Sequence, residues 1–295
     1  MSAEITLLVN PTAGRGRGAH AAQPAASALR AAGFSVRTVV GTDAADELAR
    51  LRAAVREGTG AVIAVGGDGV VSLALQALAG TLVPLAVVAV GTGNDFARAL
   101  GLPVRDPARA GRLAAEALKE GRIREIDLGR AAGTWYGTVL CSGFDSRVND
   151  RGNRMRLPLG RFKYDLAILA ELASFRPVPY RITLDDGPVI ETEATLVAVG
   201  NGTSYGGGMR ICADAEPDDG LFDVTVVGDC GRATLLKVFP QVYKGTHLGH
   251  PKVTVHRAAK VTLEAPGLTA YADGEPLGAL PVTAECVGGA LRLIV

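Results

Sequence analysis

The sequence predicts a two-domain α/β protein: a doubly wound nucleotide-binding domain followed by a second domain of β-sandwich type. Three observations indicate this fold class. Apolar runs and helical segments alternate strictly up to about residue 120, two of the apolar runs end in glycine-rich turns, and beyond Ile123 the pattern changes to short alternating strands. Strict alternation of strands and helices is typical of a parallel sheet with helices on both faces.

The first domain is predicted from four short apolar runs and the helical segments between them. Short continuous apolar runs are typical of strands buried in a parallel sheet. Asp43 is a predicted N-cap, because its side chain can accept from the free N–H groups of a first helical turn. The predicted strands are 4–9, 35–40, 61–65 and 85–90; a loop at 10–18 leads into a helix to about Ala32, and further helices cover 43–56, 70–79, 94–100 and 106–120.

Residues 1–123 are predicted to form the first domain and residues 124–295 the second. Aspartate–glycine pairs mark turns between strands in the second domain. We expect the last strand of the chain to pack back toward the first domain. The predicted strands are 125–130, 135–140, 180–185, 195–200, 221–227 and 260–264, and the predicted helices are 160–174 and 232–242.

The composition indicates a soluble globular protein. The 295 residues are 48% hydrophobic and 21% charged, and the net charge is +1, so no strong basic field indicates a nucleic-acid partner. The N-terminus enters a strand without a leader signature, and the longest apolar stretch is too short to cross a membrane. The four cysteines are far apart, which favours reduced core residues. We therefore expect a cytoplasmic protein that binds no nucleic acid.

The two glycine-rich turns predict a phosphate-binding site. Residues 65–72 read VGGDGVVS and residues 91–97 read GTGNDFA, and each turn follows a predicted strand. In an open α/β sheet, ligands bind outside the carboxyl ends of the strands, where glycines let the backbone approach a phosphate. Each turn also holds one acid, Asp68 or Asp95. An acid beside a phosphate needs a cation or a transferable proton between them, which favours magnesium-dependent nucleotide chemistry.

Two other patterns are weaker evidence for a binding site. The loop at 10–18 lacks the Gly-Lys-Ser/Thr of a Walker A motif, although its glycines and arginines suit a phosphate. His247 and His250 have a helical spacing, but they stand in a stretch with glycine and proline and have no carboxylate or cysteine partner. They therefore indicate no metal site.

Seven motifs are spread over nearly the whole chain. They are NPTAG at 10–14, GGDG at 66–69, GTGNDFA at 91–97, NG at 201–202, YGGGM at 205–209, PDDGLFD at 217–223 and DGE at 273–275. Together and in this order, they resemble the diacylglycerol/sphingosine lipid-kinase family in its soluble bacterial branch. The GGDG turn also occurs in NAD kinases and resembles that of phosphofructokinases, whereas the motifs at 91–97 and 217–223 favour lipid kinases over both.

The resemblance implies that ATP binds in the cleft between an α/β domain and a β-sandwich domain. It places the general base for the lipid hydroxyl at Glu275 or Asp273, and either could serve within hydrogen-bond reach of that hydroxyl. Arg15 and Lys163 would offset the charge that develops on the γ-phosphate. The implied nucleotide-binding residues are Asn10, Pro11, Thr12, Ala13, Gly14, Arg15, Thr42, Gly66, Gly67, Asp68, Gly69, Val70, Val71, Ser72, Thr92 and Asn94.

The resemblance also implies a magnesium site. Its ligands would be Glu216, Asp219 and the backbone carbonyl of Leu221, and oxygen donors with this spacing around a tight turn suit magnesium. In the nucleotide site, Asp68 and Asp95 would hold magnesium or waters near the γ-phosphate and would take part in catalysis with the base.

Position 70 departs from the family pattern, which has threonine after GGDG. Val70 keeps the shape of threonine but lacks the hydroxyl that could donate to a phosphate oxygen. The loss of one hydrogen bond to a charged group costs roughly 1.5–3 kcal/mol. We expect the backbone N–H of Val70 to remain available to the nucleotide. Ser72 and Leu73 also replace an expected asparagine and glutamate.

The expected partner is a diacylglycerol-like lipid, which the protein must reach without a membrane span. The segment 147–163 has six basic residues against one acid, interleaved with apolar residues. Such a segment can make transient contact with an anionic membrane surface, where each basic residue contributes about 1 kcal/mol. An exposed strand edge of the second domain could also pair two copies into a homodimer.

Three functions compete. The leading hypothesis is an ATP-dependent lipid kinase that phosphorylates the hydroxyl of diacylglycerol or a related lipid. The first alternative is a kinase of a soluble substrate, of NAD-kinase type. Asn94 and Asp95 lie inside the GTG turn and disfavour it, because NAD kinases place an Asn-Glu pair on a different loop. The second alternative is a nucleotide- or lipid-binding protein with lost or weak turnover, which Val70 supports and the retained acids disfavour.

Overall fold

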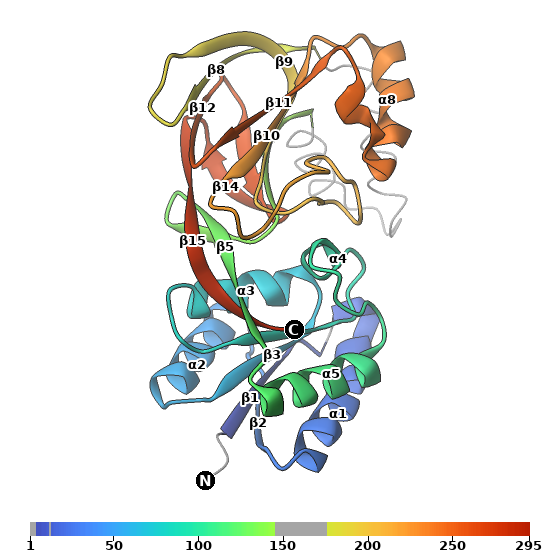
Figure 1. Ribbon diagram of the computed structural model, residues 1–295, viewed down its shortest axis with the longest axis vertical. Helices are drawn as coiled ribbons and strands as arrows, with labels where there is room; N and C mark the ends of the chain where they lie inside the picture. Colours follow the sequence, from blue (N-terminus) through green and yellow to red (C-terminus); the bar gives the residue numbers. More distant parts are fainter. Residues whose placement is uncertain (1–3, 12, 145–175) are drawn as a thin grey trace. The chain divides into compact units, whose positions relative to one another are not determined.

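The computed structural model describes residues 4–11, 13–144 and 176–295. The chain folds as two compact units (Figure 1). Unit 1 comprises Met1–Leu128, Pro217–Asp219 and Val287–Val295, and unit 2 comprises Gly129–Glu216 and Gly220–Cys286. Two strands, β5 (Ile123–Ala131) and β15 (Val282–Ile294), therefore contribute residues to both units.

Unit 1 is built on a parallel sheet. Its strands are β1 (Glu4–Val9), β2 (Ser35–Val39), β3 (Ala61–Gly66) and β4 (Leu85–Ala89), in the order β2-β1-β3-β4 with each neighbouring pair parallel. All residues of β3 and β4 are buried, as is typical of a sheet covered on both faces. The end of β15 pairs parallel to β4. The predicted doubly wound fold is confirmed.

Helices connect the strands of unit 1. They are α1 (Ala13–Ala31), α2 (Ala44–Arg56), α3 (Asp68–Leu78), α4 (Asp95–Ala99) and α5 (Pro107–Glu120). α1 packs against α5, and α2 packs against α3 (Figure 1). The Asp43 side chain accepts from the N–H of Asp46 at 2.9 Å, which confirms the predicted N-cap of α2.

The predicted loop at 10–18 is wrong from Ala13 onward, because α1 begins there. The glycines of this stretch indicated a loop, yet Gly18 has a packing role within the helix. A Cβ atom at Gly18 would lie 1.9 Å from the carbonyl oxygen of Asn10. The helix therefore contacts the end of β1 at a point where only glycine fits.

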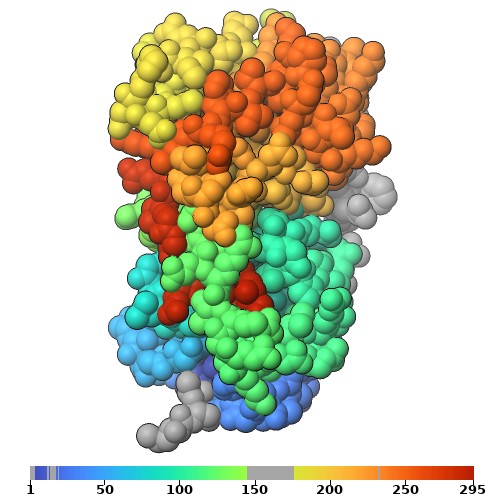
Figure 2. Space-filling model, in the orientation of Figure 1, coloured from blue at the N-terminus to red at the C-terminus, as the bar shows by residue number. Residues whose placement is uncertain are grey.

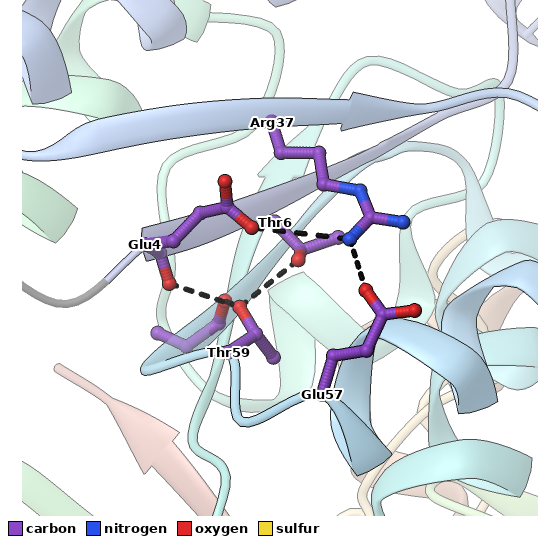
Figure 3. A network of polar contacts seen from close by, with 6 residues as sticks. Glu4, Thr6, Arg37, Glu57 and Thr59 are labelled. Carbon is purple, nitrogen blue, oxygen red and sulfur yellow. Dashed lines mark hydrogen bonds and ion pairs between the residues drawn. The ribbon is translucent and has the colours of Figure 1, made fainter.

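A polar network holds the amino ends of the strands (Figure 3). Thr6 Oγ1 donates to Thr59 Oγ1 at 2.9 Å, and Thr59 Oγ1 lies 3.0 Å from the carbonyl oxygen of Glu4. Arg37 of β2 pairs with Glu57 at the end of α2 and lies 3.9 Å from the Glu4 carboxylate. These contacts join β1, β2 and the turn before β3 at the end of the sheet opposite the glycine-rich turns.

Unit 2 is built on antiparallel strands. Most of them lie in the order β14-β13-β7-β9-β8-β12-β15, and β10 pairs with β9 and β11. A helix, α8 (Arg232–Lys244), and a 3-10 turn at Thr246–Gly249 follow β10. The strands are β6 (Thr134–Tyr136), β7 (Val139–Gly143), β8 (Val178–Leu184), β9 (Ile190–Gly200), β10 (Phe222–Gly228), β11 (Val253–Ala258), β12 (Lys260–Glu264), β13 (Thr269–Ala272) and β14 (Glu275–Ala279).

The core of unit 2 contains a stacked aromatic pair. The rings of Tyr136 and Phe222 are fully buried, with centroids 5.9 Å apart. A Cβ atom at Gly129 would lie 2.1 Å from the Tyr136 ring, so glycine at this position makes room for the ring. Burial raises the pKa of the Tyr136 hydroxyl well above its ordinary value.

Several predictions for the second half of the chain need correction. The predicted strand at 135–140 is two strands, β6 and β7, because the chain turns between them and the turn donates hydrogen bonds to Asp273. No strand was predicted at β11, β13 or β14, and the last strand, β15, was predicted without bounds because paired glycines interrupt its pattern. The predicted helix at 160–174 lies outside the described residues. Among the helices that the structure describes, none has both the length and the apolar character to cross a bilayer.

Candidate active site

The two glycine-rich turns follow β3 and β4 and pack closely against each other. A Cβ atom at Gly91 would lie 2.5 Å from the Cα atom of Gly67 and 2.9 Å from Oδ1 of Asn94. Only glycine permits this approach, since the obstructing atom of Gly67 belongs to the backbone. The structure thus brings together the two turns that the sequence singled out.

Asp68 links the two turns. Its carboxylate accepts from the N–H of Asn94 at 2.7 Å and from the N–H of Phe96 at 3.4 Å. These N–H groups lie at the start of α4, where a negative charge is favourable. Asp68 therefore holds the second turn in place, and its contact with magnesium or waters stays a prediction.

Side chains also fix the carbonyl groups of the second turn. Asn94 Nδ2 donates to the Gly91 carbonyl, Arg105 to that of Thr92 and Arg98 to that of Gly93, each at 3.0 Å. Asn94 adopts a left-handed backbone conformation with φ 59°, which asparagine tolerates better than most residues. Its Oδ1 atom is buried and makes no hydrogen bond with the described residues. The spacing of Arg98 and Arg105 in the sequence gives no signal of this role.

The start of α3 offers backbone donors to an anion. In the described part of the chain, the N–H groups of Asp68 and Gly69 make no hydrogen bond, and there is open space beside Gly69. Such groups at a helix N-terminus suit a phosphate. The expectation for Val70 is wrong: its N–H donates to the Gly67 carbonyl at 3.1 Å, and that of Val71 does so at 3.3 Å.

Other implied nucleotide residues lie near the end of β1. The N–H of Asn10 donates to the Val65 carbonyl at 3.3 Å, so this end lies beside the end of β3. Pro11 is exposed, and Ala13 and Gly14 belong to the first turn of α1. Asp95 and Asn94 are buried, Thr92 is exposed, and Ser72 is half-buried in α3. Thr12 and Lys163 lie outside the described residues, and the side chain of Arg15 is not described.

The implied residue Thr42 lies at the start of α2, beside two acids in opposite environments. Its N–H donates to Asp46 Oδ2 at 2.9 Å, and this bond, with that from Arg50, lowers the pKa of Asp46. The Glu47 side chain is only 8% exposed, and its Oε1 atom makes no hydrogen bond with the described residues. Burial raises the pKa of Glu47.

We expect opposite pH effects from Glu47→Gln and its neighbour Asp46→Asn. The native pKa of Glu47 is above 4.5, so wild type loses stability as pH rises through that pKa. Glu47→Gln should therefore raise the free energy of unfolding at pH 7 and leave it unchanged below pH 4.5. The native pKa of Asp46 is below 3.8, so Asp46→Asn should be less stable at pH 7, and the difference should vanish as pH falls through that pKa. Urea unfolding of both variants and wild type, at pH 7 and at a pH below both pKa values, measures these differences. A change in the free energy of unfolding at pH 7 that had the same sign in both variants would contradict the prediction.

The two candidate bases, Asp273 and Glu275, lie in one turn but have different surroundings. The Asp273 carboxylate accepts from the N–H of Gly137 at 2.8 Å, from the N–H of Thr138 at 2.9 Å and from the Thr138 hydroxyl. Glu275 begins β14 and is exposed, and its side chain makes no hydrogen bond or ion pair with the described residues. The geometry therefore gives Asp273 a role in holding the turn and leaves Glu275 free to accept a proton.

The implied magnesium ligands lie around the turn at 216–221. Glu216 is exposed, and Asp219 and Leu221 are half-buried. The adjacent Asp218 is paired with Arg124 at 2.6 Å, so its carboxylate is already neutralised. Among the described residues, no three acidic, histidine or cysteine side chains gather as a metal cluster. The implied set needs only two carboxylates and a carbonyl, so it stays a prediction.

Comparison with known proteins matches both halves of the chain. The diacylglycerol kinase catalytic domain matches residues 4–131, and the YegS C-terminal NAD kinase beta sandwich-like domain matches residues 138–295. A diacylglycerol kinase of Mycobacterium tuberculosis is 45% identical over 99% of this chain and 94% of its own length. The chain belongs to the diacylglycerol kinase family. Another diacylglycerol kinase, from Bacillus subtilis, is 30% identical to this family member over 93% of the chain and 90% of its own length.

Solved structures agree with this membership. A diacylglycerol kinase from Bacillus anthracis has a TM-score of 0.73 and 25% identity, covering 99% of this kinase and 96% of its own chain. An NAD kinase from Archaeoglobus fulgidus has a TM-score of 0.56 and 11% identity, covering 100% of this chain and 94% of its own. The second likeness shows the fold alone. The resemblance predicted from the motifs is confirmed, and the protein is a kinase of the lipid-kinase class.

Proposed function

We propose that this kinase transfers the γ-phosphoryl group of ATP to the hydroxyl of diacylglycerol. The observation that carries the proposal is the packed pair of glycine-rich turns, with free N–H groups at the start of α3, in a member of this family. The relatives of highest identity named above are diacylglycerol kinases, which supports this lipid as the acceptor.

The nucleotide is proposed to bind at the carboxyl ends of β1, β3 and β4. The N–H groups of Asp68 and Gly69 donate to a phosphate, and the α3 helix dipole favours its negative charge. The close contact of Gly67 with Gly91 keeps side chains away from the backbone that the phosphates approach. Asp68 and Asp95 hold waters or magnesium at this site in the proposal.

Glu275 is the proposed general base. Its carboxylate takes the proton of the acceptor hydroxyl, whose oxygen forms a bond to the γ-phosphorus. The bond from the γ-phosphorus to the oxygen that bridges to the β-phosphate breaks, and ADP leaves. Phosphoryl transfer depends mainly on positioning and on neutralisation of charge around the γ-phosphate.

Magnesium is proposed at the turn that contains Glu216, Asp219 and the Leu221 carbonyl. Hard oxygen donors fit this ion, which keeps several waters and needs few protein ligands. When bound, it supplies positive charge and orders the surrounding side chains. Arg124 keeps Asp218 out of the ligand set by pairing with it.

We expect Val70→Thr to tighten ATP binding. Val70 is 3% exposed, and its Cγ2 atom lies against Gly66, so threonine fits the space and adds a hydroxyl. A new hydrogen bond to a phosphate should lower the Kd for ATP by about 10-fold or more. Calorimetric titration with a non-hydrolysable ATP analogue measures this.

Val71→Thr is the matched control for position 70, because Val71 is also buried in the first turn of α3. Val71→Thr should lower the free energy of unfolding and leave the Kd for ATP unchanged. If Val70→Thr left the Kd for ATP unchanged, a contact between position 70 and the phosphates would be contradicted.

The proposed function is tested with a panel of acceptors in mixed micelles. Wild type is incubated with ATP and magnesium and offered diacylglycerol, sphingosine or NAD, and a parallel series contains EDTA. The proposal predicts phosphatidic acid as the product, lost with EDTA. Phosphorylation of NAD alone would assign the protein to the soluble-substrate class. ATP binding without transfer to any acceptor would identify a binding protein.

A further inference from the structure

Helix α8 has a buried face and an exposed apolar face. Val238 and Val242 are 4% and 8% exposed and pack into a core cluster of unit 2. Leu236 and Tyr243 are 57% and 47% exposed. Since they are seven residues apart, they lie on the same side of the helix. The rings of Phe239 and Tyr243 meet edge to face with centroids 5.9 Å apart. Phe239 therefore packs against Tyr243 of the exposed apolar face.

The exposed face of α8 lies at the surface of unit 2. Figure 1 draws α8 at the margin of this unit, outside its strands. In the space-filling view, the orange atoms that include α8 form part of the surface (Figure 2). Helices of soluble proteins ordinarily turn a polar face to water, so an outer face with leucine and tyrosine needs an explanation.

The charges on α8 are all positive. The helix contains no acid, and Lys237 and Lys244 are exposed without an ion pair to the described residues. Arg210 lies beside the C-terminal end of the helix, where its N–H donates to the Val242 carbonyl at 3.1 Å. Two exposed acids of the described chain are close by: Asp229, before the first turn, and Asp214, which interacts with His247 of the 3-10 turn. The helix therefore combines apolar side chains with uncompensated cations.

We propose that α8 is an interfacial helix that docks the enzyme on an anionic lipid surface. Leu236 and Tyr243 enter the boundary between headgroups and acyl chains, and Lys237 and Lys244 contact lipid phosphates. The inference rests on the proposed function only in its choice of a lipid surface, where a diacylglycerol kinase finds its acceptor. A second copy of the chain fits less well, because a two-fold contact through α8 would bring lysines together without any acid on the helix.

The test measures binding to vesicles without ATP. Wild type is sedimented with vesicles of phosphatidylcholine alone and with vesicles that also contain phosphatidylglycerol. We expect binding only to the anionic vesicles, weakened by salt. Lys237→Ala with Lys244→Ala should lower the partition coefficient about 25-fold, at about fivefold per cation. Leu236→Gln with Tyr243→Gln should lower it on the order of tenfold or more, and glutamine keeps the helix propensity.

Leu82→Gln is the matched control, because Leu82 is 80% exposed but lies on unit 1, far along the chain from α8. It should bind vesicles as wild type does. All α8 variants should phosphorylate a short-chain, water-soluble diacylglycerol at the wild-type rate, which separates docking from the chemistry. The inference is overturned if the α8 variants bind anionic vesicles like wild type. It is also overturned if size-exclusion chromatography with light scattering shows that they only convert a dimer into a monomer.

Discussion

We expect Glu275→Gln to lower kcat by about 100- to 10,000-fold and to leave KM for ATP unchanged, as the removal of a general base should. The side chain is exposed and has no partner among the described residues, so its amide disturbs no packing and no hydrogen bond. The expected loss is in the chemical step alone. Initial rates with diacylglycerol in mixed micelles, at saturating ATP, measure it.

Asp273→Asn is the contrasting variant in the same turn. The carboxylate accepts hydrogen bonds from two N–H groups and a hydroxyl, and asparagine cannot accept all of them. We expect a loss of stability of roughly 2–4 kcal/mol, since hydrogen bonds to charged groups contribute 1.5–3 kcal/mol each. Trp135 is the only tryptophan and lies in β6, next to the donating turn, so its fluorescence reports unfolding of this unit.

The two variants together assign the roles. A normal unfolding curve with lost activity in Glu275→Gln, and a shifted curve in Asp273→Asn, support the assignment. If Glu275→Gln retained wild-type kcat while a folded Asp273→Asn lost it, Asp273 would be the base and the geometric argument would be wrong.

Gly91→Ala should part the two packed glycine-rich turns of unit 1. Its Cβ atom would lie 2.5 Å from the Cα atom of Gly67, and neither backbone can move away without parting the two turns. Overpacking of this kind costs about 1–3 kcal/mol. We also expect the Kd for ATP to rise more than tenfold, because the turns would no longer present the N–H groups of α3 correctly. Hydrogen exchange across residues 91–97 and calorimetric titration measure the two effects.

Gly69→Ala is the matched variant that adds a methyl group beside the proposed phosphate site without a clash in the protein. There is open space around Gly69, and it lies in α3, where alanine is favoured over glycine by about 1 kcal/mol. This variant should therefore keep or gain stability and lose affinity for ATP only. Wild-type stability and ATP affinity in Gly91→Ala would contradict the account of the packed turns.

Much of the fold could be predicted because local signals agreed with tertiary structure in unit 1. Apolar runs marked the buried strands, and Asp43 marked a helix start that the structure confirms. The glycine-rich turns were identified because packing alone rarely places three glycines around an acid. Family motifs supplied the order of the remaining segments.

The rest depended on contacts that spacing does not encode. Gly18 indicated a loop, yet it serves a close contact between α1 and the Asn10 carbonyl. The choice between Asp273 and Glu275 needed the hydrogen bonds from residues 137 and 138, which are far away in sequence. Asp68 suggested a metal or phosphate role, whereas the structure shows its carboxylate accepting hydrogen bonds from N–H groups at the start of α4. Such long-range partners appear only once the chain is folded.

One measurement tests the central claim most directly: the fate of the terminal phosphoryl group of ATP. Wild type is incubated with magnesium, diacylglycerol and ATP labelled with ¹⁸O in the γ-phosphoryl group, and the lipids are analysed by mass spectrometry. The account predicts phosphatidic acid that carries the three labelled non-bridging oxygens, with the fourth oxygen from the lipid hydroxyl, and almost none from Glu275→Gln. Labelled inorganic phosphate or labelled NADP, without labelled phosphatidic acid, would contradict it.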